Sequence, residues 1–508
     1  MPQPDRSVIP ILFWLLLGPV LFVLILCAPT PGDMPLLAQR TAAVAAWTAV
    51  WWLSGVIPLG ATALLPFTLF PFLGVLESSK AIGYFAHWLN FLFLGGFLIA
   101  ACIEKWNLHK RIALTIIAKI GVTPRRIVFG FMLATAFVSM WVTNTATALM
   151  MLPVALAVLS KIRELDQSLS ANLAPALMLA IAYSASIGGL GTLIGTGPTG
   201  VFVSQMDSLF GQQVSFTGWM LVGMPFVIIM LPLVWVYLTR WQFPLPARLD
   251  CAIDAIAIER KALGPMKRAE WWITLVSILT ALGWLFRKEI SIGEFTIPGL
   301  QTWFPSLDND AAVALAAAFA LFCIPVNLKK REFLLDMKTA LGIPWDLLLI
   351  IGGGVCLAAG FSQSGLSEWI AGRLLFLQGA HPLLIILTCV ALITFLTELT
   401  SNVATATIFL PILGSMAVAM DQNPYLLMVP ANIAASMAFM LPVATPPNAI
   451  VYGSGQVSSQ QMARAGFGLN LIAIVLITLL FYGLTRSILG IELNQLPDWA
   501  ASTLPEQL

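Results

Sequence analysis

The segment Ser139-Met-Trp-Val-Thr-Asn-Thr-Ala-Thr147 places a cluster of hydroxyl and amide side chains in the middle of an apolar stretch. A second cluster, Thr397-Glu-Leu-Thr-Ser-Asn-Val-Ala-Thr405, interrupts a later apolar stretch in the same way. Each stretch also contains a proline, so neither fits a single straight helix. Non-helical backbone survives at membrane depth only where it is buried in protein or lines a cavity. We therefore interpret residues 124–160 and 383–420 as two re-entrant hairpins with these clusters at their tips.

The two clusters belong to a longer internal repeat with a spacing of 258 residues and no gap. Five spans and one hairpin separate the copies, so we expect the second copy to lie inverted relative to the first. Inverted repeats with broken helices near the midplane are the usual construction of secondary transporters. The repeat pairs Gly95-Gly96 with Gly353-Gly354, Ile112-Ala113 with Ile370-Ala371, Asn144 with Asn402, and Leu152-Pro153 with Leu410-Pro411.

A second pair of constellations follows the hairpins. Clustered glycines lie between Ser186 and Thr199, and a Pro-Pro pair lies between Ser436 and Asn448, both inside apolar spans. Glycines and prolines unwind helices, so we predict broken helices at 174–210 and 426–455. The alternative is a kink that only shapes packing. With one residue of slippage relative to the pairing of Ser186 with Ser436, the matched residues are Thr196 with Thr445, Pro198 with Pro447, and Thr199 with Asn448.

Composition points to lipid as the solvent. Of the 508 residues, 59% are hydrophobic and only 10% are charged, whereas a soluble domain carries roughly a quarter charged residues. Several apolar stretches reach the 18 or more residues that a membrane span needs. The net charge of +2 gives no reason to expect a nucleic-acid partner. The sequence offers no His/Asp/Glu metal cluster and no Ser/Lys dyad, so we do not expect an enzyme.

The apolar stretches and the basic residues together predict about eleven transmembrane helices. The Lys and Arg clusters all fall on one side if the N-terminus is cytoplasmic and the first hairpin does not cross the membrane. The C-terminus then lies outside. We divide the chain into an N-terminal helix and connection (1–40), a first inverted repeat (41–240), a cytoplasmic loop (241–270), and a second inverted repeat with a C-terminal helix (271–508).

Hairpin tips and broken helices suit ions of both signs. Unpaired carbonyl oxygens at a tip suit sodium, and unpaired amides at the following helix start suit an anion. An asparagine can give its side-chain oxygen to a cation and its amide hydrogens to a carboxylate. The alternative is that these polar side chains only hold helices together; their occurrence on one repeat register favours a binding role.

These motifs resemble the divalent anion/sodium symporter family, the INDY-like carriers related to solute carrier family 13. The resemblance covers nearly the whole chain apart from the termini and the 241–270 loop. It implies a scaffold that dimerises, a transport domain that moves as an elevator, and sodium-coupled import of small divalent anions across a bacterial inner membrane, above all C4 dicarboxylates such as succinate. The matching stretches include Phe91 to Gly96, Glu104 to Ala113, both hairpin tips, and Ala444 to Ile450.

The resemblance also implies the site residues. The first sodium site would use Ser139, Thr143, Asn144 and Gly195, and the second would use Thr397, Asn402 and Ala444. Substrate contacts would fall on Asn144, Thr145, Thr196, Asn402, Thr445 and, nearby, Pro446.

This sequence departs from the family pattern at three places. Thr143 replaces a serine and keeps the hydroxyl, and Gly197-Pro198-Thr199 replaces a Pro-Pro-Asn. Val403 stands where a second threonine would donate to the substrate, so a methyl group takes the place of a hydroxyl. The last change weakens the expectation of a symmetric substrate with two carboxylates.

Other transport functions remain open at this point. An exchanger, or a carrier of sulfate or a tricarboxylate, would use the same fold. A proton-coupled antiporter would need a titrating carboxylate, for which Glu398 is the candidate, although a structural pairing of Glu398 inside the hairpin is the other interpretation. Two tips that each contain an asparagine favour sodium coupling over proton coupling.

Overall fold

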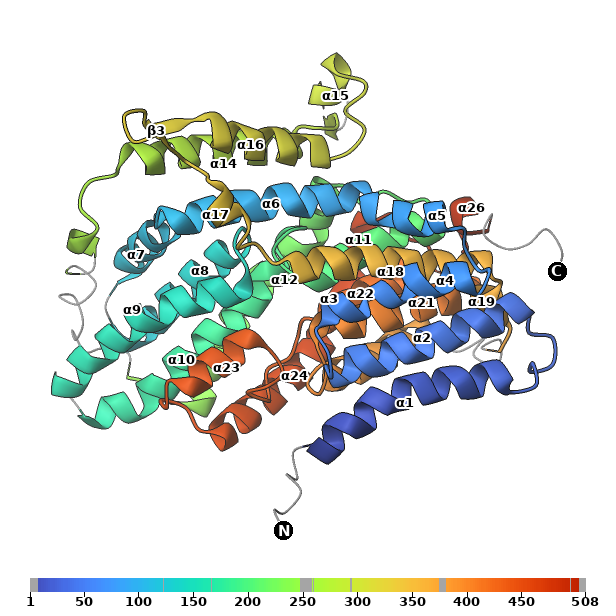
Figure 1. Ribbon diagram of the computed structural model, residues 1–508. Helices are drawn as coiled ribbons and strands as arrows, with labels where there is room; N and C mark the ends of the chain where they lie inside the picture. Colours follow the sequence, from blue (N-terminus) through green and yellow to red (C-terminus); the bar gives the residue numbers. More distant parts are fainter. Residues whose placement is uncertain are drawn as a thin grey trace, which may run out of the picture.

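The computed structural model describes residues 8–121, 123–165, 167–246, 258, 260–292, 295–373, 381–493 and 495–501. These residues form a bundle of helices that run roughly side by side (Figure 1). Seven helical segments among them are long and apolar enough to cross a membrane, and five shorter apolar helices accompany them. The predicted all-α, multi-span fold is therefore confirmed. The seven segments are Ser78–Lys105, Asn144–Glu164, Leu169–Gly189, Phe216–Gln242, Trp345–Gln363, Asn402–Ala419 and Ser459–Ile488.

The repeat is visible in the order of the helices. Helices α7 to α10 each begin 258 residues before α19 to α22. The first series is α6 (Trp88–Lys105), α7 (Leu108–Ile120), α8 (Pro124–Ser139), α9 (Asn144–Leu165), α10 (Gln167–Gly189), α11 (Gly197–Phe210) and α12 (Phe216–Val236). The second series is α18 (Trp345–Gln363), α19 (Leu366–Arg373), α20 (Pro382–Leu396), α21 (Asn402–Ala419), α22 (Tyr425–Ala434), α23 (Pro446–Gly453) and α24 (Ser459–Leu480).

The polar clusters interrupt the helices where the sequence indicated. The backbone leaves the helix between α8 and α9 at residues 140–143, and between α20 and α21 at residues 397–401. It leaves the helix again between α10 and α11, and between α22 and α23. Prolines occupy the first turn of α8, α11, α20 and α23, where their missing N–H costs no hydrogen bond.

The remaining helices cover the two repeats. Helix α16 (Ala311–Cys323) packs on α6, with α14 (Arg268–Leu285) beside it as an outer layer, and α1 (Val8–Cys27) packs on α2 (Leu36–Ser54) along another side (Figure 1). The shorter helices are α3 (Leu59–Thr62), α4 (Leu64–Phe72), α5 (Ser78–Gly83), η1 (Tyr84–Ala86), η2 (Tyr237–Gln242), α15 (Leu300–Trp303), α17 (Met337–Ala340), η4 (Phe481–Thr485), α25 (Arg486–Ile488) and α26 (Asp498–Ala501).

Three features were not predicted. Helix α7 is a separate helix in a segment for which the sequence predicted no span. Two small antiparallel hairpins flank α16: β1 (Ile290–Ile292) with β2 (Phe295–Ile297), and β3 (Pro325–Asn327) with β4 (Glu332–Phe333). They lie in the connections, so they leave the helical fold class unchanged. Within the predicted 241–270 loop, residues 247–257 and 259 lie outside the described residues.

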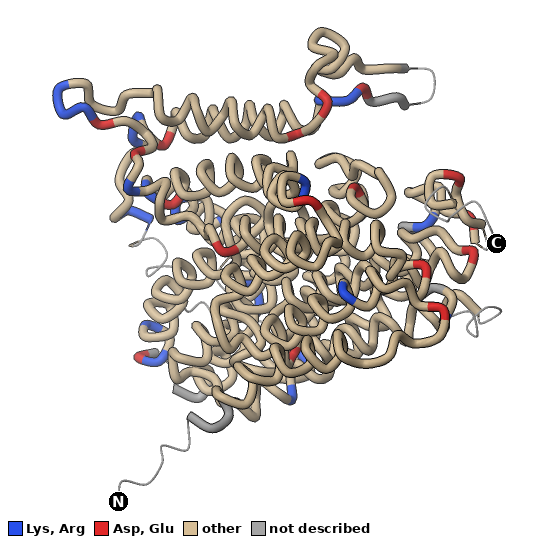
Figure 2. The backbone as a smooth tube through the Cα atoms, turned by 45° about the vertical axis from the view of Figure 1, so that its right-hand side comes forward, with Lys and Arg blue, Asp and Glu red and all other residues tan. Residues whose placement is uncertain are grey.

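The charged residues gather mainly toward the two ends of the body (Figure 2). Most of the Lys and Arg lie at the end where α7 and the β3–β4 hairpin are found, and α26 lies at the opposite end (Figures 1 and 2). A helical body with charged ends and an apolar middle is the arrangement that a bilayer requires.

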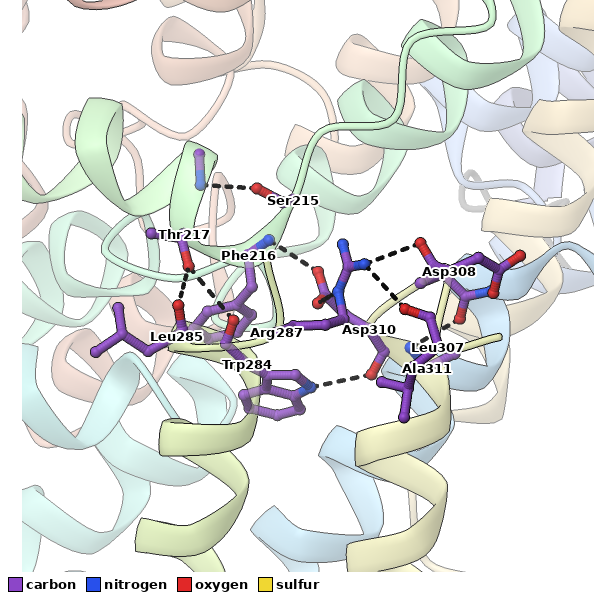
Figure 3. Close-up of polar contacts among 12 residues, drawn as sticks. Ser215, Phe216, Thr217, Trp284, Leu285, Arg287, Leu307, Asp308, Asp310 and Ala311 are labelled. Atoms are coloured by element: carbon purple, nitrogen blue, oxygen red, sulfur yellow. Dashed lines mark hydrogen bonds and ion pairs between the residues drawn. The ribbon is translucent and has the colours of Figure 1, made fainter. Parts of the chain in front are cut away.

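A buried polar joint connects α12 to the outer layer (Figure 3). Asp310 accepts a hydrogen bond from the Phe216 N–H (2.9 Å) and forms an ion pair with Arg287. Arg287 also donates to two backbone carbonyl oxygens of residues 307 and 308, and the Trp284 indole N–H donates to the Asp310 carbonyl oxygen (3.0 Å). Because both charged side chains are buried, the joint fixes the start of α12 against the end of α14 and the start of α16.

Candidate functional site

The first hairpin tip gathers oxygen atoms from three helices. Ser139 is the last residue of α8 and Asn144 is the first of α9. The Ser139 hydroxyl lies 2.6 Å from Asn144 Oδ1 and 2.8 Å from the Ala185 carbonyl oxygen of α10. A hydroxyl has one hydrogen, so it cannot donate to both oxygens at once. The tip therefore holds more acceptor oxygens than hydrogens to share between them.

The Asn144 amide extends this oxygen cluster to the break in the next helix. The same terminal atom of the amide lies 3.0 Å from the Ala185 carbonyl oxygen and 3.3 Å from the Gly195 carbonyl oxygen. If that atom is oxygen, four oxygens converge and a cation would satisfy them; if it is nitrogen, its two hydrogens can go to only two of the other three oxygens. In both orientations the surrounding protein atoms are oxygen acceptors, which suits a hard cation such as sodium.

Glycine makes the close approach at this tip possible. A Cβ atom at Gly189, the last residue of α10, would lie only 2.8 Å from Asn144 Oδ1 and 2.9 Å from the Gly195 carbonyl oxygen. Real Cβ atoms do not come so close to other atoms, so any larger residue at 189 would push the tip and the break apart. The clustered glycines therefore do more than unwind the helix, because they let its broken ends close around the asparagine.

The second tip repeats the arrangement. Thr397 Oγ1 lies 2.8 Å from Asn402 Oδ1 and 2.9 Å from the Ala435 carbonyl oxygen. Asn402 begins α21, as Asn144 begins α9. The hydroxyl, the asparagine and the backbone carbonyl oxygen thus have the same arrangement in both copies of the repeat. Ser139 and Thr397, which carry the hydroxyls, are both fully buried.

The other two expected sodium ligands, Thr143 and Ala444, make local backbone contacts. Thr143 Oγ1 accepts a hydrogen bond from the Ala146 N–H (3.3 Å), so this side chain caps α9. The Ala444 N–H donates to the Leu441 carbonyl oxygen (3.2 Å), and no hydrogen bond within the described residues joins Ala444 to Thr397. The sequence analysis missed the Ala185 and Ala435 carbonyl oxygens. Each directly precedes a serine of the matched constellations, which was the available signal.

Four helices begin at these breaks, namely α9, α11, α21 and α23. Thr196 and Thr445 stand at the N-caps of α11 and α23 with nearly the same extended backbone, φ −143° and ψ 142° against φ −139° and ψ 151°. Helix α11 packs against α21, and α23 packs against α9. The first turn of a helix leaves N–H groups without intrahelical acceptors and carries partial positive charge, so these starts can hold an anion.

The remaining expected substrate contacts lie on the first turns of these helices. Thr145 is partly exposed on α9, Val403 is partly exposed on α21, and Pro446 is exposed at the start of α23. Val403 lies against Gly197, the first residue of α11. The structure thus brings Val403, the residue after Asn402, next to Gly197, and Asn144 next to Gly195.

Glu398 holds the second break in place. Its carboxylate accepts hydrogen bonds from the N–H groups of Phe439 (2.6 Å), Met440 (2.9 Å) and Leu441 (3.1 Å), and from the Asn470 side chain (2.8 Å). Four donors to one carboxylate make a well-satisfied buried charge. Of the two interpretations left open by the sequence, the geometry favours structural pairing.

The family model for the sodium:sulfate symporter transmembrane region matches residues 11–490. The chain belongs to the sodium:sulfate symporter family. The resemblance deduced from the motifs is thereby confirmed: the protein is a multi-pass membrane transporter with bacterial relatives, not an enzyme.

Two relatives in this family are similar over nearly their full length. A sodium-dependent dicarboxylate transporter, SdcS, from Staphylococcus saprophyticus is 42% identical over 490 residues, which cover 95% of this chain and 92% of the relative. The protein of the same description from Staphylococcus aureus (strain MRSA252) is 41% identical over 492 residues, which cover 95% and 93%.

Two solved transporter structures share the fold of this chain at much lower sequence identity. The Alcanivorax borkumensis YdaH transporter matches with a TM-score of 0.55 at 14% identity, over 87% of this chain and 98% of its own. Neisseria gonorrhoeae MtrF matches with a TM-score of 0.53 at 13% identity, over 96% and 97%. At these identities the likeness concerns the fold alone.

Proposed function

We propose that this protein is a sodium-coupled symporter of small divalent anions, above all C4 dicarboxylates such as succinate. The observation that carries the proposal is the pair of repeat-related oxygen clusters, Ser139 with Asn144 and Thr397 with Asn402, each beside the start of two helices. The two staphylococcal relatives, which are named sodium-dependent dicarboxylate transporters, support the same ion and the same class of substrate.

Each oxygen cluster would hold one sodium ion as a co-substrate. At the first tip the ligands are the Ser139 hydroxyl, Asn144 Oδ1 and the carbonyl oxygens of Ala185 and Gly195. At the second they are Thr397, Asn402 and the Ala435 carbonyl oxygen. Side-chain and backbone oxygens at unwound helix ends are the usual sodium ligands in such carriers. Thr143 and Ala444 complete the two ligand sets that the family resemblance implies.

The anion would lie between the two clusters. The helix starts at α9, α11, α21 and α23 offer N–H groups and positive dipole ends to its carboxylates. Asn144 and Asn402 can serve cation and anion together, since the oxygen of the amide faces sodium and the N–H₂ faces the carboxylate. Thr145, Thr196 and Thr445 add hydroxyls, and Pro446 borders the site.

Sodium and anion binding are coupled because the two ligands contact the same side chains and because their opposite charges attract each other. Sodium fixes the asparagine amide with its hydrogens toward the anion, and its positive charge lowers the free energy of the bound carboxylate. By thermodynamic reciprocity the anion raises the affinity for sodium by the same factor. Sodium alone leaves the N–H groups of the tip without an acceptor, and the anion alone leaves the oxygen cluster without a cation. Binding of both together is therefore favoured.

The chain would transport by moving the hairpins and broken helices as one unit past a scaffold. A cavity of about 660 Å³ separates α14 from the hairpin helix α8 and the α10–α11 break, and it is lined mainly by apolar side chains. The boundary between the moving unit and the scaffold helices α6 and α18 is called the seam here. Across it, Gly96 of α6 faces Ile194 of the α10–α11 break, and its repeat partner Gly354 of α18 faces Thr407 of α21. Small residues leave a smooth contact over which one unit can slide. The scaffold would also form the homodimer that the family resemblance implies.

Uptake into proteoliposomes tests the proposal. Labelled succinate should accumulate when an inward sodium gradient is imposed and not when potassium replaces sodium. Labelled citrate and sulfate, measured in parallel, test the alternative substrates. Succinate uptake that ignores sodium but requires internal dicarboxylate would support exchange instead. Uptake driven by a proton gradient alone would contradict the proposed coupling.

A further inference from the structure

Two positions break the symmetry of the site. The repeat sets Val403 opposite Thr145, and with the slippage noted above it sets Gly197 opposite Pro446. The hydroxyl–asparagine contacts, the backbone carbonyl oxygens and the N-cap threonines all recur in both halves. Against this shared framework, the pairs Thr145/Val403 and Gly197/Pro446 change one hydroxyl and one side chain between the two halves.

These two positions touch each other. A Cβ atom built on Gly197 would lie 2.5 Å from Cγ2 of Val403 and 3.0 Å from Cδ1 of Leu347 in α18. The Val403 methyl group thus occupies the space that a side chain at position 197 would fill. A proline at 197, like its counterpart Pro446, could not coexist with Val403 in this position. The two departures from symmetry are one coupled change.

The nearby Thr407 hydroxyl does not replace the missing one. Thr407, one turn further along α21, is fully buried and donates its hydrogen to the Val403 carbonyl oxygen (2.7 Å). Val403 keeps its own N–H in the first turn of α21. A carboxylate on this side therefore still meets the Asn402 amide and backbone N–H groups, but methyl groups stand where the other half presents the Thr145 hydroxyl.

We propose that Gly197, Val403 and Leu347 form an apolar wall on the α21 side of the anion site. The wall selects C4 dicarboxylates that carry a polar substituent on at most one central carbon. A malate molecule can turn end for end and direct its hydroxyl toward Thr145. A tartrate molecule has a hydroxyl on both central carbons, so one of them faces the wall in either orientation and loses its hydrogen bonds to water without replacement. This inference rests on the proposed function.

Competition against labelled succinate uptake tests the wall. In the wild type, the half-inhibitory concentration of tartrate should exceed that of malate by about tenfold or more, the equivalent of one lost hydrogen bond. Val403→Thr keeps the shape of the side chain and adds a hydroxyl. It should therefore lower the half-inhibitory concentration of tartrate, divided by that of unlabelled succinate, by about fivefold or more. The sodium concentration that gives half-maximal uptake should stay unchanged. An unchanged ratio would contradict the proposal that the apolar wall selects against tartrate.

The contact itself has a separate readout in purified protein. Gly197→Ala should lower the melting temperature and succinate uptake, and the double variant Gly197→Ala/Val403→Ala should recover both, because the smaller side chain at 403 makes room. A double variant no better than Gly197→Ala would overturn the contact. If the wild type shows no sodium-dependent succinate uptake, the proposed function fails and the selectivity inference fails with it, whereas the melting temperatures still report the contact.

Discussion

Asn144 and Asn402 each begin a helix, and each has a buried hydroxyl within 2.8 Å of its side-chain oxygen. In the proposed site each of these two amides binds both a cation and an anion. Asn144→Ala and Asn402→Ala should therefore each reduce sodium-dependent succinate uptake by about a hundredfold or more, because at least two charge-assisted contacts are lost together.

The control for these variants is Asn172→Ala. Asn172 is exposed and donates only to the Pro244 carbonyl oxygen (3.2 Å), far along the chain from either tip. It should transport at the wild-type rate, and all three variants should elute as folded protein on size-exclusion chromatography. Near-normal uptake in either tip variant, with normal sodium dependence, would remove that asparagine from the site.

Individual residues also mark where sequence reasoning succeeded and where it stopped. The hydroxyl and amide side chains of both tips could be predicted because polar groups in an apolar stretch stand out. The Ala185 and Ala435 carbonyl oxygens were harder to predict, since a backbone ligand leaves no signature in its own side chain and only the serine that follows each alanine marks the place. The contact between Gly197 and Val403 also escaped prediction, because the two residues are distant in sequence and only the fold brings them together.

At the scale of the element, the hairpins and broken helices were predictable because prolines and glycines fix where a helix can begin or end. Helix α7 was missed because it is short and amphipathic. Basic residues interrupt its apolar sequence, so it does not resemble a membrane span. The β1–β2 and β3–β4 hairpins are two or three residues deep and lie in connections, below the length at which alternation can be recognised.

The joint between α12, α14 and α16 should make a large contribution to stability (Figure 3). Arg287→Met leaves Asp310 charged, buried and without its partner, which typically costs about 3–5 kcal/mol. The melting temperature of the detergent-solubilised protein should fall clearly. The matched control is Lys80→Met, because the Lys80–Glu77 pair is exposed (60% and 73%) at 3.7 Å and such pairs contribute about 0–1 kcal/mol. Equal melting temperatures for the two variants would mean that the joint is not buried as described.

The cavity beside α14 allows a test of the proposed movement. Ala281 lines this cavity, whereas its neighbour Leu282 is exposed on the outer face of α14. Ala281→Trp would fill the gap between α14 and the hairpin, so we expect the maximal rate of succinate uptake to fall about tenfold while equilibrium succinate binding stays within about twofold. Leu282→Trp adds the same ring to the other face and should do neither. A normal maximal rate in Ala281→Trp would argue against sliding at this seam.

The two ends of the whole molecule should lie on opposite sides of the membrane. Ala262, which precedes α14, belongs to the basic end, and Asp498 in α26 belongs to the opposite end (Figure 1). Single cysteines at these exposed positions, in a background without the six native cysteines, should react with an impermeant reagent from opposite sides of the membrane. Reaction from the same side would mean that residues 382–419 cross the membrane once instead of returning to the face they entered from.

The dependence of succinate uptake on sodium concentration tests the central claim, that two repeat-related sodium sites flank one anion site. Wild-type protein in proteoliposomes should give a sigmoidal curve with a Hill coefficient above about 1.5, since a Hill coefficient can approach the number of coupled sites. Ser139→Ala and Thr397→Ala should each shift half-saturation to higher sodium by about threefold or more, because each removes one oxygen from a different cluster, and Thr397→Ser should restore it. A hyperbolic curve with a Hill coefficient of about 1 in the wild type, or sodium dependence altered by only one of the two alanine variants, would contradict the account.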